Sequence, residues 1–384
     1  MNLNNPILPG QTIGIIGGGQ LGRMMAISAK EMGYDIAVLD PTPNSPCGQI
    51  ADIEIVANYD DLNAIKKLAK VSDVITYEFE NIDYEALNWL QEHTNLPQGS
   101  ELLKITQDRG TEKKAITDAG IEVAPYLLID NERDLLVGVR KLGLPCVLKT
   151  RRGGYDGKGQ AVIKSTNDIS QTLPLLDAGP CVLEAWIAFE KEVSVIVTRN
   201  SSGDVTTFPI SENIHHENIL HQSIVPARVT PLVEKNAIEK AISLANTFQL
   251  VGTLAVEMFV TSDEGIFINE LAPRPHNSGH YTIEACETSQ FDQHIRAICG
   301  LPLGDTKLLS PVVMVNILGE HVEPIIKKTQ ISPVGKLHLY GKKEAKTKRK
   351  MGHITILGDS IDQAMGKVKE IDIWQDEMIG GVSK

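Results

Sequence analysis

The sequence predicts a chain of mixed α/β and α+β structure with more than one domain. Its 384 residues exceed the size at which a single hydrophobic core usually stops growing, so two or three domains are expected. A β-branched run at residues 12–16 leads into a glycine turn at 17–22, which predicts a β-α-β unit. Alternating runs at residues 253–260 and 266–270, joined by a short turn, predict an antiparallel hairpin.

Composition and charge exclude several classes of function. The formal net charge is −12, and so acidic a protein is poorly suited to general binding of nucleic acid or of a membrane surface. No apolar run reaches membrane-spanning length, and the N-terminus has no signal-peptide pattern. The five cysteines form no CxxC pair and are typical of reduced, mostly buried thiols. We therefore expect a cytoplasmic protein that acts on small molecules.

The first glycine motif predicts an anion site at the start of a helix. Residues 17–22 read Gly-Gly-Gly-Gln-Leu-Gly, and Asp40 ends the next strand, where dinucleotide-binding folds place a ribose-binding acid. A nicotinamide site is one interpretation. However, Asp40 leads directly into a proline-rich turn at 41–46, and a glycine turn at a helix N-terminus binds any phosphate, including that of a sugar phosphate. Glu78 follows the strand predicted at 74–77 and is a candidate acceptor for a ligand amine or hydroxyl.

A second glycine-rich segment predicts a flexible hairpin over phosphate groups. Residues 148–160 read Leu-Lys-Thr-Arg-Arg-Gly-Gly-Tyr-Asp-Gly-Lys-Gly-Gln, between strand-like runs at 146–148 and 161–163. Glycine lets backbone amides approach an anion closely, and Lys149 and Lys158 add positive charge. The segment is not a Walker A loop, because the Gly-Lys-Ser/Thr ending that opens a helix is missing. A solvated hairpin turn is the alternative.

Acidic residues at strand ends predict contacts with a metal ion and with hydroxyl groups. The hairpin can bring Glu257 and Glu270 together on one face, with Asn269 beside them. Converging carboxylates repel unless a cation lies between them, and oxygen ligands next to a phosphate favour Mg²⁺ over zinc. Glu184 and Glu192 lie near other strand ends and are candidates for an adenine amino group and ribose hydroxyls.

The spacing of apolar residues predicts two further helices. Residues 100–120 carry Arg109, Lys113 and Lys114; cations on a helix are usually solvated, although Arg109 could point into a nucleotide cleft. Residues 283–299 predict a single helix.

Two loops are dense in groups that bind anions or transfer protons. Residues 273–280 read Pro-Arg-Pro-His-Asn-Ser-Gly-His, in which histidine can exchange a proton near neutral pH. Residues 340–353 form a basic cluster, which is either a phosphate clamp or a solvated charge run. His215 and His216 point to opposite faces of an extended chain, so no zinc site is expected there.

These motifs, in this order, resemble the ATP-grasp enzymes, in which two α+β lobes hold ATP and metal ions bridge its phosphates to acids. The closer resemblance is to the N5-carboxyaminoimidazole ribonucleotide synthetase family of purine biosynthesis. Residues 15–24, 154–160, 269–280 and 348–353 carry this resemblance, which extends over nearly the whole chain. It implies a Rossmann-like pre-ATP-grasp domain at 1–107, an ATP-grasp domain at 108–305 with a flexible lid lobe at about 124–190, and a β-rich C-terminal domain at 306–384. It also implies a homodimer.

The resemblance implies ATP-dependent carboxylation of 5-aminoimidazole ribonucleotide with bicarbonate. The products would be N5-carboxyaminoimidazole ribonucleotide, ADP and phosphate, by way of carboxyphosphate. The expected cofactor is Mg²⁺, as one or two ions, with no covalent cofactor. Another ATP-grasp ligase, such as a formate-dependent glycinamide ribonucleotide transformylase or a biotin carboxylase, would share the ATP residues. An NAD-dependent oxidoreductase rests on the first glycine turn alone.

The motifs and the resemblance together give each candidate residue a role. The residues expected to bind ATP are Arg109, Lys149, Gly154, Tyr155, Asp156, Gly157, Lys158, Gly159, Gln160, Glu184, Ala185, Trp186, Ile187, Glu192, His215, Asn269 and Glu270. The metal ligands would be Glu257 and Glu270, and the catalytic residues Arg274, His276, Tyr155 and Lys158. The residues expected to bind the other substrates are Gly19, Gln20, Leu21, Glu78, Tyr155, Asp156, Arg274, His276, Asn277, Lys342, Arg349 and Lys350, while Lys346 and Lys348 are further candidates for the phosphate.

Overall fold

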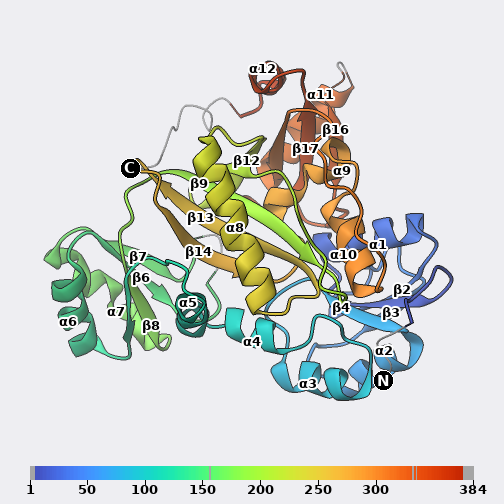
Figure 1. Ribbon diagram of the computed structural model, residues 1–384, viewed down its shortest axis with the longest axis horizontal. Coiled ribbons are helices and arrows are strands. Elements are labelled where there is room, and N and C mark those ends of the chain that lie inside the picture. The colour runs from blue at the N-terminus through green and yellow to red at the C-terminus, as the bar shows by residue number, and fades with distance from the viewer. Residues whose placement is uncertain (1–4, 155–156, 331–332, 334, 375–384) are drawn as a thin grey trace.

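The computed structural model describes residues 5–154, 157–330, 333 and 335–374, which build three β-sheets and their covering helices (Figure 1). The N-terminal sheet is parallel, as expected for a β-α-β opening, with the strand order β3-β2-β1-β4. Its elements are β1 (Thr12–Ile16), α1 (Gln20–Glu31), β2 (Asp35–Asp40), β3 (Ile53–Val56), α2 (Leu62–Val71), β4 (Val74–Tyr77) and α3 (Tyr84–His93).

Alternate residues of this parallel sheet are buried in two different cores. Ile13 and Ile15 of β1 pack with α1 and with α10 (Gln290–Ile298) on one face. Ile16 packs with α2 and α3 on the other face. Because both faces are covered, β1, β2 and β4 are almost continuously buried, whereas the edge strand β3 is mostly exposed. Helix α10 comes from far along the chain, so an apolar contact joins the N-terminal sheet to the rest of the molecule.

A small antiparallel sheet, β5-β8-β6-β7, forms a separate lobe at the left of Figure 1. Its elements are β5 (Tyr126–Ile129), α6 (Glu132–Leu142), β6 (Cys146–Thr150), β7 (Gln160–Ile163), α7 (Ile169–Asp177) and β8 (Cys181–Ala185). Cys146 and Leu148 point into the core under α6 and α7, so Val147 and Lys149, one residue on, point to the opposite face. That face is the one available to a ligand.

The central sheet is antiparallel and has the order β14-β13-β9-β11-β12-β15-β17-β16, with β10 also paired to β9. Its strands are β9 (Phe189–Arg199), β10 (Val205–Thr207), β11 (Ser211–His216), β12 (Ile219–Val225), β13 (Gly252–Thr261), β14 (Ile266–Ala272), β15 (Val312–Leu318), β16 (Lys336–Leu339) and β17 (Lys350–Leu357). The β-rich C-terminal segment therefore extends this sheet through the β12–β15 pairing instead of forming a sheet of its own. The remaining helices are α4 (Glu101–Thr106), α5 (Arg109–Asp118), α8 (Pro231–Thr247), α9 (Thr282–Ala285), α11 (Val322–Thr329) and α12 (Ile361–Ile371).

The single helix expected at residues 283–299 is wrong, because the structure has two, α9 and α10. Cys286 is extended and bridges to Leu308, which ends α9. The Ser289 side chain then accepts a hydrogen bond from the Asp292 amide and caps a new helix. Among the helices of the described ranges, none is long and apolar enough to cross a membrane.

Replacing Gly17 by alanine should destabilise the turn between β1 and α1. Gly17 has φ +103°, and a Cβ there would lie 2.4 Å from Glu78 Cγ. Gly10 also has a positive φ, +89°, but its Cβ would meet nothing within 4 Å. Gly17→Ala should therefore lower the free energy of unfolding by about 3 kcal/mol, and the control Gly10→Ala by about 1 kcal/mol, in urea denaturation. Equal losses would contradict the close approach of Glu78.

Candidate active site

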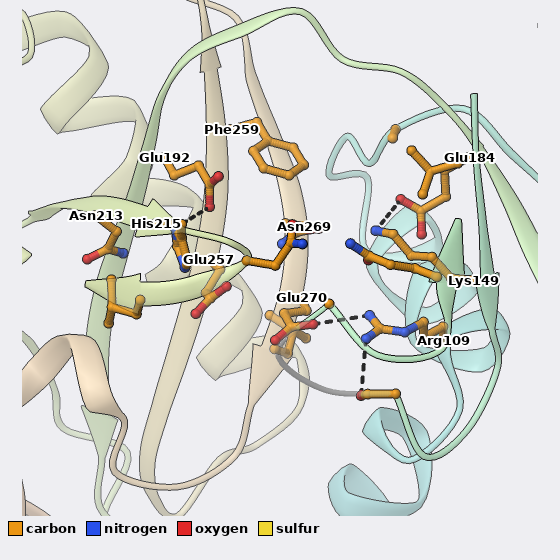
Figure 2. Close-up of a pocket in the computed structure, with 18 of the residues that line it drawn as sticks. Arg109, Lys149, Glu184, Glu192, Asn213, His215, Glu257, Phe259, Asn269 and Glu270 are labelled. Carbon is orange, nitrogen blue, oxygen red and sulfur yellow. Dashed lines mark hydrogen bonds and ion pairs between the residues drawn. The ribbon is translucent and has the colours of Figure 1, made fainter. Parts of the chain in front are cut away.

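A cavity of about 860 Å³ lies between the small sheet and the central sheet. Its walls come from α5, from β6 and β8 of the small sheet, and from β9, β11, β13 and β14 of the central sheet. Figure 2 shows Arg109, Lys149 and Glu184 on one side, Glu192 and His215 on the other, and Glu270 between them. Segments far apart in the sequence thus form one site.

A β-bulge on β14 turns two neighbouring polar residues into this cavity. Glu257 pairs with Glu270, whereas the next residue of β13, Met258, pairs with Ile268, which leaves Asn269 as the extra residue. Neighbours on a regular strand point to opposite faces, and a bulge removes that restriction. Asn269 and Glu270 consequently both line the cavity, opposite Glu257.

The two paired carboxyls differ in their electrostatic environment. Burial raises the pKa of Glu257 to about 8, and the charge of Glu270 adds to this effect. Burial would also raise the pKa of Glu270, but Arg109 Nη1, 3.1 Å from Glu270 Oε2, lowers it. Asn269 Oδ1 is buried and has no hydrogen-bond partner among the described residues. This set of oxygen donors fits Mg²⁺, whose charge would favour the ionised form of both acids.

Glu184 lies between two ammonium groups. Its Oε2 is 3.0 Å from Lys149 Nζ, and its Oε1 is 3.2 Å from Lys113 Nζ. Burial would raise the pKa of Glu184, but the two lysines lower it to about 2. Lys149 Nζ donates a hydrogen bond to Oε2, whereas Oε1 is paired with Lys113 by charge but accepts no hydrogen bond among the described residues. Residues 184–187 all line this wall of the cavity.

On the opposite wall, Glu192 and His215 form an ion pair between neighbouring strands. Glu192 Oε2 lies 3.1 Å from His215 Nδ1. Burial would lower the pKa of His215, but the charge of Glu192 raises it. The pair joins β9 to β11 beside Glu257, so both residues face the cavity as the sequence predicts.

The loop after β14 places Arg274 and His276 next to the acid pair. Arg274 Nη2 lies 2.7 Å from Glu80 Oε1, and His276 Nε2 lies 3.2 Å from Glu257 Oε1. Burial and the charge of Arg274 hold the pKa of His276 well below its usual value, so the ring is neutral at pH 7. Its Nδ1 accepts the Ser278 amide, which assigns the proton to Nε2. The Nε2 proton of His276 therefore lies on the side of the ring that faces Glu257.

A second group of candidates gathers at the N-terminus of α1. Glu78 accepts the amides of Gly19 and Gly22, the latter at 2.6 Å, so a carboxylate already occupies part of this helix terminus. Lys342 Nζ donates to Gln20 Oε1 and to the Lys350 carbonyl, both at 2.6 Å. Because Lys350 also lines the main cavity, the two regions adjoin.

The structure brings most of the candidate residues together. Those that line the cavity are Arg109, Lys149, Gly154, Gly157, Lys158, Gln160, Glu184, Ala185, Trp186, Ile187, Glu192, His215, Glu257, Asn269, Glu270, Arg274, His276, Asn277 and Lys350. Those that do not line it are Gly19, Gln20, Leu21, Glu78, Gly159, Lys342 and Arg349. Arg349 is exposed and donates to the Glu344 carbonyl. Tyr155 and Asp156 lie outside the described residues.

Sequence reasoning missed several residues of the site. Glu80 pairs with Arg274, and the sequence signal for it is its position just beyond the carboxyl end of β4, which it shares with Glu78. Phe259 lines the cavity two residues after Glu257, as alternation along β13 would predict. Lys113 was expected to be solvated, yet its side chain is only 1 % exposed.

Outside this cavity, Glu284, His338 and His353 bring potential metal-ligand atoms within 4.8 Å of one another. The rings of His338 and His353 stack with an interplanar angle of 11°. The lone pairs of an imidazole lie in its ring plane, so those of two parallel rings do not converge on one ion. His353 Nδ1 lies 2.9 Å from the Tyr340 hydroxyl, and His338 Nε2 lies 2.5 Å from Glu284. These contacts join α9 to the C-terminal strands.

Comparison with known proteins follows the same division of the chain. Three family models match it: a ribonucleotide synthetase preATP-grasp domain at residues 10–107, an ATP-grasp domain at 114–291, and a phosphoribosylaminoimidazole carboxylase C-terminal domain at 312–367. The N5-carboxyaminoimidazole ribonucleotide synthase of Bacillus subtilis (strain 168) is 59% identical over 357 residues, 93% of this chain and 94% of that protein. The chain belongs to the N5-carboxyaminoimidazole ribonucleotide synthetase family.

Solved members of the family have the same fold. An N5-carboxyaminoimidazole ribonucleotide synthetase in complex with ADP matches with a TM-score of 0.96 and 62% identity, covering 98% of this chain and 100% of that one. A Staphylococcus aureus synthetase, also complexed with ADP, has a TM-score of 0.92 and 43% identity, covering 96% and 98%. The resemblance and the ATP-grasp fold expected from the sequence are thereby confirmed.

Replacing Glu184 by glutamine should destabilise the protein less at acid pH than at neutral pH. The folded pKa, about 2, lies below the usual value of 4.5, so the contribution of Glu184 is complete above pH 4.5 and is lost as the pH falls towards 2. At about pH 3.5 the difference in unfolding free energy between wild type and Glu184→Gln should be smaller than at neutral pH by roughly 1 kcal/mol or more. Urea denaturation measures both values, and a constant difference would contradict the ion triad.

Proposed function

We propose that this protein is an ATP-dependent ligase that carboxylates 5-aminoimidazole ribonucleotide with bicarbonate, giving N5-carboxyaminoimidazole ribonucleotide, ADP and phosphate in purine biosynthesis. One observation carries the proposal: cations for phosphate, a carboxylate pair for Mg²⁺ and the Arg274–His276 loop line a single cavity in a member of this family. A synthase from Aspergillus clavatus, 32% identical with a TM-score of 0.90, was solved with ADP and 5-aminoimidazole ribonucleotide, which supports the same pair of ligands here.

The ATP phosphates would lie against Arg109, Lys149 and the glycine-rich hairpin. Phosphoryl transfer needs mainly positioning and neutralisation of charge, and these groups supply both. Glu257 and Glu270 would hold Mg²⁺, with Asn269 beside them, and the ion would neutralise charge on the phosphates. The hairpin joins β6 to β7 in the separate small lobe, so movement of that lobe would close the site and exclude water from carboxyphosphate.

Bicarbonate is a poor electrophile, so the carboxylation requires that it be activated close to the exocyclic amine of the ribonucleotide. A bicarbonate oxygen would attack the γ-phosphorus of ATP, with ADP as the leaving group, and the carboxyphosphate so formed would release phosphate and CO₂. The exocyclic amine would then attack the carbon of CO₂, and the released phosphate would accept the proton that the amine loses. Arg274 would hold the bicarbonate-derived anion. His276, neutral with its proton on Nε2, would serve in this state as a hydrogen-bond donor and not as a base.

The ribonucleotide would bind beyond this loop, near the N-terminus of α1. Glu78 takes the Gly19 amide, so the phosphate would use the amides of Gln20 and Leu21 together with Lys342 and the basic residues up to Lys350. Glu78 is the proposed contact to the aminoimidazole, and Arg349 is a proposed contact to the phosphate. Tyr155, Asp156 and Asn277 complete the proposed substrate set.

Three further features belong to the proposal. The division into domains at 1–107, 108–305 and 306–384 is supported by family matches of similar extent. A cytoplasmic location is supported by five free, buried cysteines. A homodimer is supported by the resemblance to the family alone.

ADP release should require both bicarbonate and the ribonucleotide. In a coupled assay with ATP and Mg²⁺, omission of either should reduce the rate to background, with buffers degassed because dissolved CO₂ supplies bicarbonate. Turnover with formate or biotin, and none with 5-aminoimidazole ribonucleotide, would overturn the proposal in favour of another ATP-grasp ligase.

Glu270→Gln should lower kcat by at least about 100-fold, because it removes a charged ligand of the proposed metal ion. Binding of the ribonucleotide, measured by calorimetry, should change little. Asp263→Asn, in the exposed turn of the same hairpin, is the matched control and should leave kcat at the wild-type value. Wild-type turnover by Glu270→Gln would rule out the metal assignment.

A further inference from the structure

Lys113 is a buried cation to which the reaction described above gives no role. It lies on α5 at i+4 from Arg109, so the two side chains share one face of the helix. Lys113 is 1 % exposed and is absent from the cavity lining, whereas its partner Glu184 does line the cavity. An ammonium group so deeply buried is costly unless its charge is compensated. Lys113 therefore lies outside the cavity lining, and the Glu184 carboxylate lies between it and Lys149.

Helix α5 connects the two lobes that enclose the cavity. Glu112 Oε1 accepts the Leu271 amide of β14 at 2.8 Å, which ties the helix to the central sheet. Lys113 reaches Glu184 on β8, and the Arg109 amide donates to the Arg151 carbonyl at the end of β6. The position of Lys113 is consequently set by both lobes, and Figure 1 shows α5 between them.

The charges around Glu184 explain what Lys113 can do for a ligand. Lys149 and Glu184 alone form a neutral pair, and a neutral pair attracts phosphate weakly. Within the group Lys113, Glu184 and Lys149, two ammonium groups face one carboxylate and one positive charge remains, with Arg109 and Glu112 as neighbouring charged groups. Lys113 is buried and does not line the cavity, whereas Lys149 does, so the remaining charge is directed towards the cavity.

We propose that Lys113 is a positioning residue for ATP, which neutralises Glu184 from behind the cavity wall and thereby leaves the charge of Lys149 available to the phosphates. This inference rests on the proposed ATP-dependent reaction. In this proposal Glu184 positions the Lys149 side chain. Lys113 offsets the negative charge of Glu184, so that Glu184 does not neutralise the positive charge of Lys149.

Lys113→Gln should raise the KM for ATP and weaken ADP binding about tenfold each, while the KM for the ribonucleotide changes less than about twofold. Lys114→Gln, one residue on and exposed, is the matched control and should match wild type. In a Glu184→Gln background there is no carboxylate to neutralise, so adding Lys113→Gln should change ADP affinity less than about twofold.

A tenfold effect of Lys113→Gln in both backgrounds would mean that the residue serves packing alone, and no effect in the wild-type background would also overturn the inference. If Lys113→Gln does not fold, Lys113→Met, which buries no polar group, repeats the cycle. Calorimetry with ADP does not depend on turnover. A wild-type protein that binds ADP but carboxylates nothing would contradict the proposed function, and the mutant cycle would still decide the role of Lys113.

Discussion

The site depends on buried charges that are compensated across a boundary between two sheets. Lys113 on α5 pairs with Glu184 on the small sheet, and Arg109 on the same helix pairs with Glu270 on the central sheet. Removing ions from water costs several kcal/mol each, and attraction in a low-dielectric interior offsets that cost only where the geometry is good. The two lobes must therefore be placed correctly for either pair to form, and the same placement leaves cations facing the cavity.

Local backbone irregularities complete this arrangement. The bulge on β14 allows Asn269 and Glu270 to share a face, and without it only one of them could meet Glu257. Glu257 then feels the charge of Glu270, which raises its pKa, while Arg109 keeps Glu270 ionised. Neighbouring carboxyl groups whose pKa values are shifted in opposite directions are typical of functional sites, because burial and specific charge partners are combined there.

Sequence patterns predicted the local elements well and their partners less well. Alternation gave the hairpin of β13 and β14, and the glycine turn gave the first β-α-β unit. The helix expected at residues 283–299 divides in two, because Cys286 pairs with Leu308, a contact that no local pattern contains. The C-terminal strands likewise have a partner that no local pattern contains, because β15 continues the central sheet next to β12.

The sequence by itself determined which chemical groups were available and in what local form: the lysine hairpin, the Glu257…Asn269-Glu270 pair and the Arg274–His276 loop. These follow from periodicity and residue type, which act over a few residues. Only the tertiary structure decided which charges meet. It placed Lys113 in the interior beside Glu184, and it put Glu78 on the amides of Gly19 and Gly22. Burial and ion pairing depend on segments distant in the chain, so the same lysine is solvated or enclosed according to what packs against it.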